Sequence, residues 1–295
     1  MDMKTRGTAE MTAAMMISGT IGWFVVQSGL PIPQLVFWRS LFAAVTLTVV
    51  CLAMGLLKPG VITWRQAALA AGGGVAVVCN WLLLFESYSR ASISVSTAVY
   101  NTQPFMLVAL STLFLGEKVT ASKLGWMVAA FAGVLLIAQG KPGEAGSDYL
   151  LGIALAASAA FLYAVVALVA KQLKGVPPHL IVLIQVVVGT MVFLPFARFD
   201  NPMNPQAWTM VVSLGALHTG VMFVLFYGAL QRLPTTLAGT LSFIYPVVAI
   251  IVDYLAFGHR LVWTQWLGAA VILLAAAGMT LGWSWHRREV SGQGG

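Results

Sequence analysis

Charged residues are scarce in this chain. Asp, Glu, Lys and Arg make up 8% of its 295 residues, while 59% of them are hydrophobic. Soluble globular domains carry about 25% charged residues, so this chain cannot cover a water-facing surface. The two cysteines, Cys51 and Cys79, both lie in apolar segments, where we expect them to pack as small hydrophobic side chains and not to form a disulfide framework. The composition predicts a polytopic membrane protein.

Several sequence motifs of enzymes and pumps are also absent. The chain has no Gly-rich loop ending in Gly-Lys-Ser/Thr, which excludes an ATP-driven pump of that type. It has no His-Glu-x-x-His sequence, no paired aspartates in the middle of a span and no Ser-His hydrolase motif, so nothing indicates an intramembrane hydrolase. We therefore expect no enzymatic activity, no metal and no cofactor.

Basic residues outnumber acidic ones, 16 to 9. They are scattered through short connectors instead of forming a basic face, so the sequence does not predict nucleic-acid binding. Their distribution favours a role in membrane topology and in attraction to anionic lipids.

Ten apolar stretches are long enough to cross a bilayer, since a helix needs roughly 20 apolar residues to span the hydrocarbon. They are rich in Gly and Ala as well as Leu and Val, which suits closely packed membrane helices, and every connector is too short to hold a soluble domain. The sequence thus predicts an all-α polytopic protein of ten transmembrane helices. The ten stretches are 11–29, 35–55, 67–88, 92–115, 121–139, 149–171, 178–197, 208–230, 236–257 and 263–285.

The distribution of Lys and Arg predicts the orientation. With the N-terminus inside, eleven Lys and Arg fall on the inner side, four fall in outer connectors and Arg39 falls within a span. Because Lys and Arg are retained in the cytoplasm, both termini are expected there, in a bacterial inner membrane. The polar start Met1–Glu10 is followed by an apolar run without a small-residue cleavage site, so we expect an uncleaved first span.

A second pattern is a repeat at an offset of 142 residues. The matched positions lie in equivalent places of the fourth and ninth spans, so each copy holds five spans: residues 1–140 and 141–295. Five is odd, and the second copy must cross the bilayer in the opposite sense. The sequence therefore predicts two inverted five-helix repeats around a central cavity, an arrangement typical of alternating-access transporters. The matched pairs are Arg90 and Arg232, Pro104 and Pro246, Leu113 and Leu255, Gly116 and Gly258, and Lys118 and Arg260.

Four short motifs carry a resemblance that covers essentially the whole chain. They are FWRS at 37–40, SRAS at 89–92, QPF at 103–105 and LGEKVT at 115–120. Together they resemble the drug/metabolite transporter superfamily, in the form with two EamA-type halves. Within it, the chain looks most similar to the YddG-type exporters of aromatic amino acids. The second copy departs from the family's usual Gly-Glu at FGHR, where His259 stands, which implies that Glu117 is mainly a loop or cap residue.

The two matched prolines, Pro104 and Pro246, lie inside spans. Each removes a backbone hydrogen bond and hinders another, so each is expected to bend its helix at a matched depth. Matched bends are candidate hinges for alternating access. The alternative is a pair of static kinks that only shape packing, since proline is common in membrane helices.

Polar side chains at mid-depth are candidates for substrate binding, because polar groups are costly in hydrocarbon. His218, in the eighth span, is positioned to bind a carboxylate or carry a proton; the alternative is a neutral imidazole bonded to a neighbouring helix. Asn80, Asn101 and Gln103 have the donors and acceptors to bind a zwitterion. They are equally suited to holding helices together.

Aromatic residues form the second candidate set. A ring substrate stacks on such side chains, and an ammonium group binds over their faces; the alternative for each is packing against lipid or at the interface. Tyr100, Tyr163 and Tyr245 rank highest because small or bending residues flank them. The remaining aromatic candidates are Trp23, Trp38, Phe85 and Tyr88, whereas Trp263, Trp266, Trp283 and Trp285 are expected to form an interfacial belt.

Three charges lie near the outer ends of spans: Arg39, Glu86 and Asp253. They suggest an outer gate in which Arg39 pairs with Glu86 or Asp253, and the alternative is snorkelling of each to the headgroups. No acidic residue is expected at the midplane, so the sequence does not support proton coupling through a buried carboxylate.

These features predict an alternating-access secondary transporter, active as a monomer, that exports aromatic or large neutral amino acids. Two alternatives stay open. The first is an exporter of other metabolites or of cationic drugs. The second is a solute channel, which would not need two matched hinges.

Overall fold

The computed structural model describes the chain except residues 1–2, 117–118, 140–145, 200–202 and 284–295. Within the described residues the regular structure is entirely helical, and ten helical segments are long and apolar enough to cross a membrane. This confirms the predicted all-α fold. The first half contains α1 (Met3–Gln27), α2 (Ile32–Ala53), α3 (Trp64–Ala91), α4 (Ile93–Tyr100), α5 (Gln103–Leu115) and α6 (Ala121–Ala138). The second half contains α7 (Ser147–Gln172), α8 (Pro178–Phe193), η1 (Leu194–Phe196), α9 (Pro205–Gly215), η2 (Ala216–Val221), α10 (Met222–Arg232), α11 (Thr235–Ser242), α12 (Ile244–Phe257) and α13 (Trp263–Thr280).

The first two spans begin earlier than hydropathy predicted. Helix α1 starts at Met3 and includes the polar residues Lys4 and Arg6, whereas the apolar run starts at 11. Helix α2 starts at Ile32 instead of 35, with Pro31 as its N-cap. Proline is tolerated in the first helical turn, where backbone N–H groups have no intrahelical partner. The extent of the apolar run therefore underestimates the length of both helices at their N-terminal ends.

The two helix breaks fall at equivalent positions. Helix α4 ends at Tyr100 and α5 begins at Gln103, while α11 ends at Ser242 and α12 begins at Ile244. Each last residue before a break lies four positions before a proline, Pro104 or Pro246, whose ring excludes that carbonyl from a helical hydrogen bond. The sequence predicted a bend at each proline, and the structure breaks each helix within the turn before it.

The helices that follow the breaks end in the same way. Gly116 terminates α5 and Gly258 terminates α12, both in the left-handed conformation with φ of 67° and 68°. Glycine adopts this conformation without steric cost, which is why it ends helices so often. Glu117 and Lys118, for which the sequence predicts a loop or cap role and a basic repeat position, lie outside the described residues.

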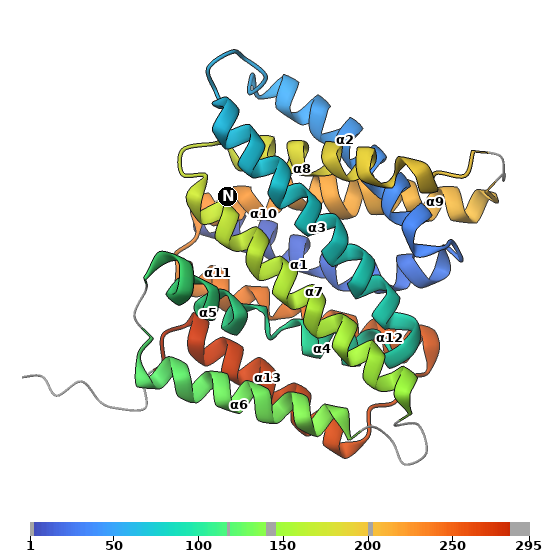
Figure 1. The fold of residues 1–295 in the computed structure, drawn as a ribbon, viewed down its shortest axis with the longest axis vertical. Helices are drawn as coiled ribbons and strands as arrows, with labels where there is room; N and C mark the ends of the chain where they lie inside the picture. Colours follow the sequence, from blue (N-terminus) through green and yellow to red (C-terminus); the bar gives the residue numbers. More distant parts are fainter. Residues whose placement is uncertain (1–2, 117–118, 140–145, 200–202, 284–295) are drawn as a thin grey trace, which may run out of the picture.

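Helices of each half pack mainly against helices of the other half, which we call the exchange pattern. Helix α3 packs along α7 and α8, and in the other half α9 and α10 pack along α1 while α9 packs on α2. Helices α2 and α8 pair with each other, as do α6 and α13, which run side by side at the lower edge of Figure 1. At the α6–α13 contact, a Cβ added to Gly268 would lie 2.5 Å from the Gly133 carbonyl oxygen, so the two backbones touch there.

The matched arginines occupy equivalent packing sites. Arg90, at the end of α3, bonds Asp148 at the start of α7 and lies over Gly152, where an added Cβ would be 2.8 Å from Arg90 Cβ. Arg232, at the end of α10, bonds Glu10 of α1 at 2.8 Å and lies over Gly7, where an added Cβ would be 2.9 Å from Arg232 Cβ. The two pairs lie at opposite ends of the bundle. Each joins the third span of one half to the first span of the other.

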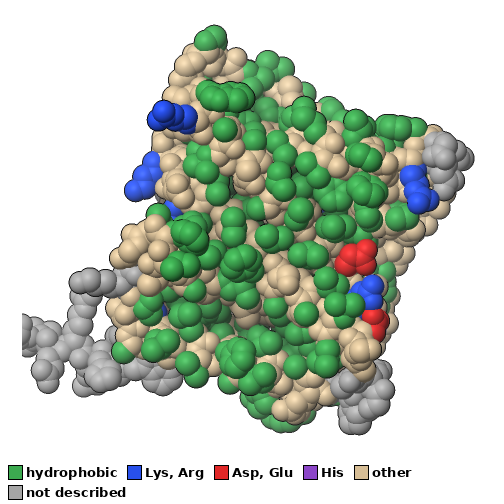
Figure 2. Space-filling model, in the orientation of Figure 1, with side chains coloured by type: hydrophobic (Ala, Val, Ile, Leu, Met, Phe, Trp, Pro, Cys, Tyr) green, Lys and Arg blue, Asp and Glu red, His purple; other side chains and the backbone are tan. Residues whose placement is uncertain are grey.

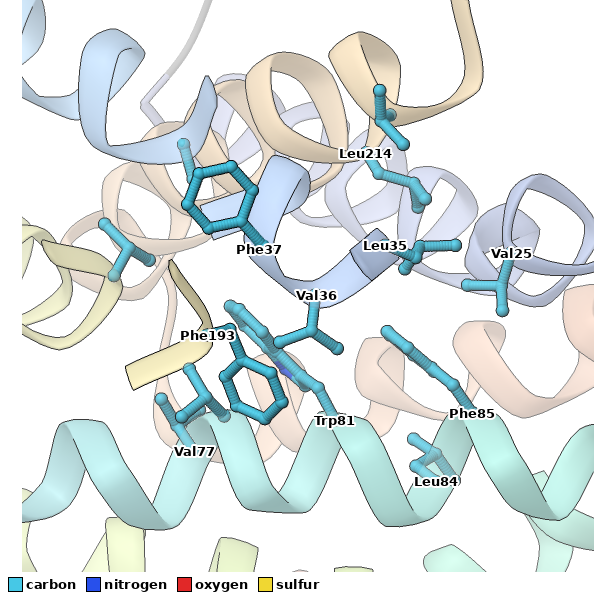
Figure 3. Packing of buried hydrophobic residues seen from close by; sticks show 14 of the residues in the cluster. Val25, Leu35, Val36, Phe37, Val77, Trp81, Leu84, Phe85, Phe193 and Leu214 are labelled. Atoms are coloured by element: carbon cyan, nitrogen blue, oxygen red, sulfur yellow. The ribbon is translucent and has the colours of Figure 1, made fainter. Parts of the chain in front are cut away.

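The main hydrophobic core lies where α2, α3, α8 and α9 meet. Figure 3 shows Trp81 and Phe85 projecting from α3 toward Leu35 and Val36 of α2, with Phe193 of α8 beside them. On the surface, the charged side chains visible in Figure 2 lie at two opposite edges, and hydrophobic side chains dominate the band between them. Such a band matches the hydrocarbon of a bilayer. The protein is a multi-pass membrane protein.

Candidate functional site

A wide helical turn in the eighth span positions two polar side chains. Residues Ala216–Val221 form a π-helix, in which carbonyls are released from the regular i→i+4 pattern. His218 Nδ1 lies 3.0 Å from the Ser213 carbonyl oxygen, and Thr219 Oγ1 donates to the Leu214 carbonyl at 2.9 Å. Each side chain thus lies at hydrogen-bond distance from the carbonyl five residues earlier, which matches the i→i+5 spacing of a π-helix.

Two glycines let the wide turn approach α2. A Cβ added to Gly215 would lie 2.4 Å from Phe42 Cβ, and one added to Gly220 would lie 2.4 Å from Thr46 Cγ2. Both distances are far below van der Waals contact, so neither position has room for a larger residue. The glycines therefore bring Thr219 close to the middle of α2.

Arg39 meets this turn from α2. Its side chain is buried, with the residue 2% exposed, and its Nε donates to Thr219 Oγ1 at 3.2 Å. The guanidinium carbon lies 4.0 Å from the centre of the Trp81 ring and 5.3 Å from that of Phe85, which are cation–π distances. Arg39 Nη1 is buried and has no hydrogen-bond partner among the described residues.

The predicted outer gate pairs are not formed in this conformation. Arg39 lies seven residues inside α2, so it is deeper than the one turn that the apolar run implied, and it pairs with neither acid. Asp253, which is fully buried, instead accepts hydrogen bonds from Ser94 and from His259 Nδ1, the latter at 2.8 Å. Glu86 is half-buried and forms no ion pair with a described residue. Burial of Arg39 and Asp253 also contradicts snorkelling.

The four predicted tyrosines lie near one another, and two of them also lie near Arg39. Tyr88 and Tyr100 are within electrostatic range of the guanidinium, and Tyr245 is within the same range of both tyrosines. The ring centres of Tyr100 and Tyr163 are 5.8 Å apart in an edge-to-face arrangement. These side chains come from α3, α4, α7 and α12, so both halves of the chain contribute to one aromatic cluster.

Asn80 and His218 border the same cluster. Asn80 Nδ2 lies 3.3 Å from the Tyr100 hydroxyl and donates to the Ala159 carbonyl of α7 at 2.5 Å. His218 Nε2 lies 3.0 Å from Thr20 Oγ1 of α1, and its ring centre lies 4.4 Å from that of Phe24. Both side chains therefore bond neighbouring helices, which is what we expect if they hold helices together instead of binding a substrate.

Three predicted residues lie elsewhere. Trp38 packs against Trp208 at 4.8 Å between ring centres, on another side of α2 from Arg39. Trp23 is half-buried and meets Phe24 edge-on at 4.8 Å. Asn101 donates from Nδ2 to the Thr97 carbonyl at 2.7 Å, so it caps the end of α4. Phe85 is part of the core and contributes to the site through Arg39.

Sequence reasoning missed Trp81 and Thr219. Both carry a signal. Trp81 precedes Phe85 by four residues and Tyr88 by seven, which places the three rings on one face of α3. Thr219 is a polar residue next to His218 in an apolar span. The sequence does not show that this face of α3 and Thr219 meet at Arg39.

A cavity of about 430 Å³ opens beside the cluster on the side of the bundle opposite Met3. Phe85 and Tyr88 of α3 line it, together with Phe257 and His259 at the end of α12. Phe85 thus borders both this cavity and the Arg39 guanidinium. The walls of the cavity are largely apolar, and Tyr88, Ser89 and His259 supply its polar groups, which suits an aromatic or apolar solute with one polar end.

The equivalent half-helices α4 and α11 differ in burial. All eight residues of α4 are buried, whereas Ala238 is the only buried residue among the side chains described in α11. Helix α4 packs on α3, α7, α12 and α13, while α11 makes its main contacts with α1, α10 and α13. The bundle is therefore packed more tightly around α4, at the side opposite Met3, than around α11, at the side of Met3, and the cavity meets α4 at its first residue, Ile93.

Comparisons with known proteins agree with this architecture. The model of the EamA-like transporter family matches residues 8–139 and again residues 150–281. The uncharacterised transporter YxxF of Bacillus subtilis is 32% identical over 94% of this chain and 89% of its own length. An uncharacterised transporter of Archaeoglobus fulgidus is 24% identical over 94% of this chain and 96% of its own length. The protein RarD of Escherichia coli is 25% identical over 76% of this chain and 75% of its own length.

One solved crystal structure superposes with a TM-score of 0.65 at 19% identity and covers 98% of this chain and 99% of its own. At that identity the likeness concerns the fold. The family model, in contrast, covers both five-span halves of the chain. This protein belongs to the EamA-like transporter family and is a transporter rather than an enzyme.

Proposed function

We propose that this transporter exports aromatic or large neutral amino acids across a bacterial inner membrane, as a monomer, with both termini in the cytoplasm. The proposed mechanism is alternating access, in which two inverted halves, residues 1–140 and 141–295, rock around a shared site. The site is the cluster of Arg39, Tyr88, Tyr100, Tyr163 and Tyr245. Pro104 and Pro246 serve as the hinges.

The observation that carries the mechanism is the difference between α4 and α11. In an inverted repeat these half-helices are equivalent, and a symmetric closed molecule would bury them alike. Helix α4 is wholly buried, whereas most of the described residues of α11 are half-buried and Thr240 is exposed, as expected of a carrier that is closed on one side and open on the other. An open channel has no need of such a difference.

The inverted repeat itself is supported by matched local features. The family model matches the chain twice, the breaks at Asn101 and Phe243 are 142 residues apart, and both following helices end at a left-handed glycine. The exchange pattern of helix contacts agrees with it. Together these features support two copies of one unit that cross the membrane in opposite senses.

The substrate class is supported by the composition of the cluster. Tyrosine rings from both halves offer flat apolar surfaces for a ring or a large side chain, and hydroxyl groups at the same place offer donors and acceptors. A metabolite without an apolar part would gain little from such walls.

Transport by purified protein in liposomes tests the proposal. We expect labelled phenylalanine or tryptophan to accumulate by counterflow against unlabelled substrate, which a channel cannot sustain. Alanine at Tyr100, Tyr163, Tyr245 or His218 should reduce the rate without unfolding the protein. Tyr254→Ala is the matched control, because this tyrosine of α12 is 48% exposed and outside the cluster. Unchanged rates in all four variants would contradict the site, and flux without counterflow would contradict the carrier.

A further inference from the structure

Arg39 is a buried cation whose hydrogen-bonding capacity is mostly unused. A guanidinium carries five N–H donors, and among the described residues it makes one hydrogen bond, from Nε to Thr219. Nη1 is buried without a partner among the described residues, and no described carboxylate pairs with the side chain. Burying a charge without a counter-charge is costly, so this arrangement calls for a reason.

The surroundings of Arg39 hold the guanidinium in place without neutralising it. Trp81 and Phe85 flank it at 4.0 and 5.3 Å, and cation–π contacts of this kind offset part of the desolvation cost. The hydroxyls of Tyr88 and Tyr100 are within electrostatic range. The two rings and the hydrogen bond to Thr219 hold the guanidinium in place and leave its charge available.

A partner for this cation can come from the solute. Tyr100 interacts with Arg39, Tyr163 stacks edge-on against Tyr100, and Tyr163 is 38% exposed. The tyrosine cluster thus runs from an exposed ring to the buried guanidinium. A solute whose ring lies against these tyrosines would place a polar end near Arg39.

We propose that Arg39 is the anchor for a carboxylate of the transported solute, so that the protein recognises carboxylate-bearing molecules with an apolar or aromatic part. Guanidinium and carboxylate form paired, charge-assisted hydrogen bonds. The inference rests on the proposed transport function and refines it: a purely cationic solute would meet Arg39 as a repelling charge.

Binding to purified protein tests the anchor separately from transport. The four probes share a phenyl ring. Phenylalanine and phenylacetate carry a carboxylate, and phenylalaninamide and 2-phenylethylamine do not. Binding of each is measured by thermal shift and by competition. We expect the two carboxylates to bind at least tenfold more tightly than the amide and the amine. Phenylacetate against phenylalanine then tells whether an amino group is also recognised. Equal binding of the amine and the acids, or no stabilisation by either acid, would overturn the anchor.

Three variants separate anchoring from a structural role. Arg39→Gln and Arg39→Met should lose the preference for carboxylates, and Arg39→Lys should keep part of it, because an ammonium retains the charge but not the fork. Since no described carboxylate pairs with this charge, Arg39→Met should unfold at the same or a higher temperature than wild type, whereas replacing a structural arginine would leave a protein that unfolds at a lower temperature. Arg260→Gln is the matched control, an arginine 6.0 Å from the Tyr254 ring at the surface. Wild-type carboxylate preference in Arg39→Gln would contradict the proposal.

Transport assays then distinguish the two proposals. If the wild-type protein binds acids through Arg39 but moves none of the probes in liposomes, the anchor stands and the proposed transport of these amino acids fails. If it moves amide and amine as fast as the acids, transport stands and the anchor fails.

Discussion

Asp253 and Ser94 join the broken fourth and ninth spans. The carboxylate Oδ2 of Asp253, near the end of α12, accepts hydrogen bonds from the Ser94 backbone nitrogen at 2.8 Å and from Ser94 Oγ at 2.5 Å. Ser94 is in the first turn of α4, where backbone N–H groups lack helical partners and a negative charge is favoured. His259 Nδ1, 2.8 Å from Oδ1, occupies the other oxygen. The contact fastens the side of the bundle that is tightly packed.

Weakening this contact should open that side. Because a hydrogen bond to a charged group contributes about 1.5–3 kcal/mol, Asp253→Asn is expected to shift the conformational equilibrium toward opening at the side opposite Met3. The measurement is the labelling rate of Ala98→Cys, at a fully buried position of α4, by a water-soluble maleimide in a background without Cys51 and Cys79. We expect a severalfold rise. Asp148→Asn, which removes an exposed ion pair at the same side, is the control and should leave the rate unchanged.

The asymmetry between the half-helices predicts a second labelling result. Thr240 in α11 is exposed and its equivalent in α4, Ala98, is 2% exposed. In the wild-type background, Thr240→Cys should react with the maleimide much faster than Ala98→Cys. A transported solute that cycles the protein should bring the two rates closer together. Similar rates in the absence of solute would contradict a protein closed at one side.

The sequence predicted the ten spans and a bend near each helix break because the causes of these features are local. Length, apolar composition and the ring of a proline act on their own segment, so Pro104 and Pro246 mark breaks wherever the rest of the chain lies. The site was predicted less well. Four tyrosines converge as expected, but Trp38 packs outside the cluster. In a span that is apolar on all faces, hydropathy does not distinguish the face toward the site from the face toward other helices or lipid.

The central arginine shows the same limit. The depth of Arg39 depends on where α2 begins, and the prolines at its start concealed that first turn. Its partner Thr219 is presented by a π-helical turn, which differs from an α-helix by one residue in register and leaves no mark in the pattern of apolar residues. That Arg39 has no carboxylate partner among the described residues is a property of the packed bundle and could not be derived from the order of residues.

Close packing at the wide turn predicts the cost of two small substitutions. Gly215→Ala and Gly220→Ala would each place a methyl group 2.4 Å from a side chain of α2, and such overpacking costs about 1–3 kcal/mol. Both variants should unfold at lower temperature and transport less, because Thr219 is pushed away from Arg39. Gly72→Ala is the matched control within α3. No atom of a described residue lies within 4 Å of the added Cβ, so this variant should gain about 0.5–1 kcal/mol in stability. If all three behave alike, the contact with α2 is not a tight one.

Substitution of the two prolines tests whether the helix breaks act as hinges or are static kinks. Pro104→Ala restores an N–H that is able to bond the Tyr100 carbonyl, and Pro246→Ala does the same for Ser242. A new helical hydrogen bond contributes about 0.5–1.5 kcal/mol, which slows a conformational step by up to about tenfold if the bond must break each cycle. We therefore expect slower transport together with unchanged or higher thermal stability in each variant.

Pro178→Ala provides the comparison for both hinge variants, because this proline is the first residue of α8 and its missing N–H has no helical partner to lose. It should transport at the wild-type rate. Because the two halves are proposed to move as equivalents, Pro104→Ala and Pro246→Ala should slow transport by similar factors, and the double variant should be slower than either. Wild-type rates in both single variants would show that the breaks only shape the packing, and the hinges would then have to lie in the loops between spans.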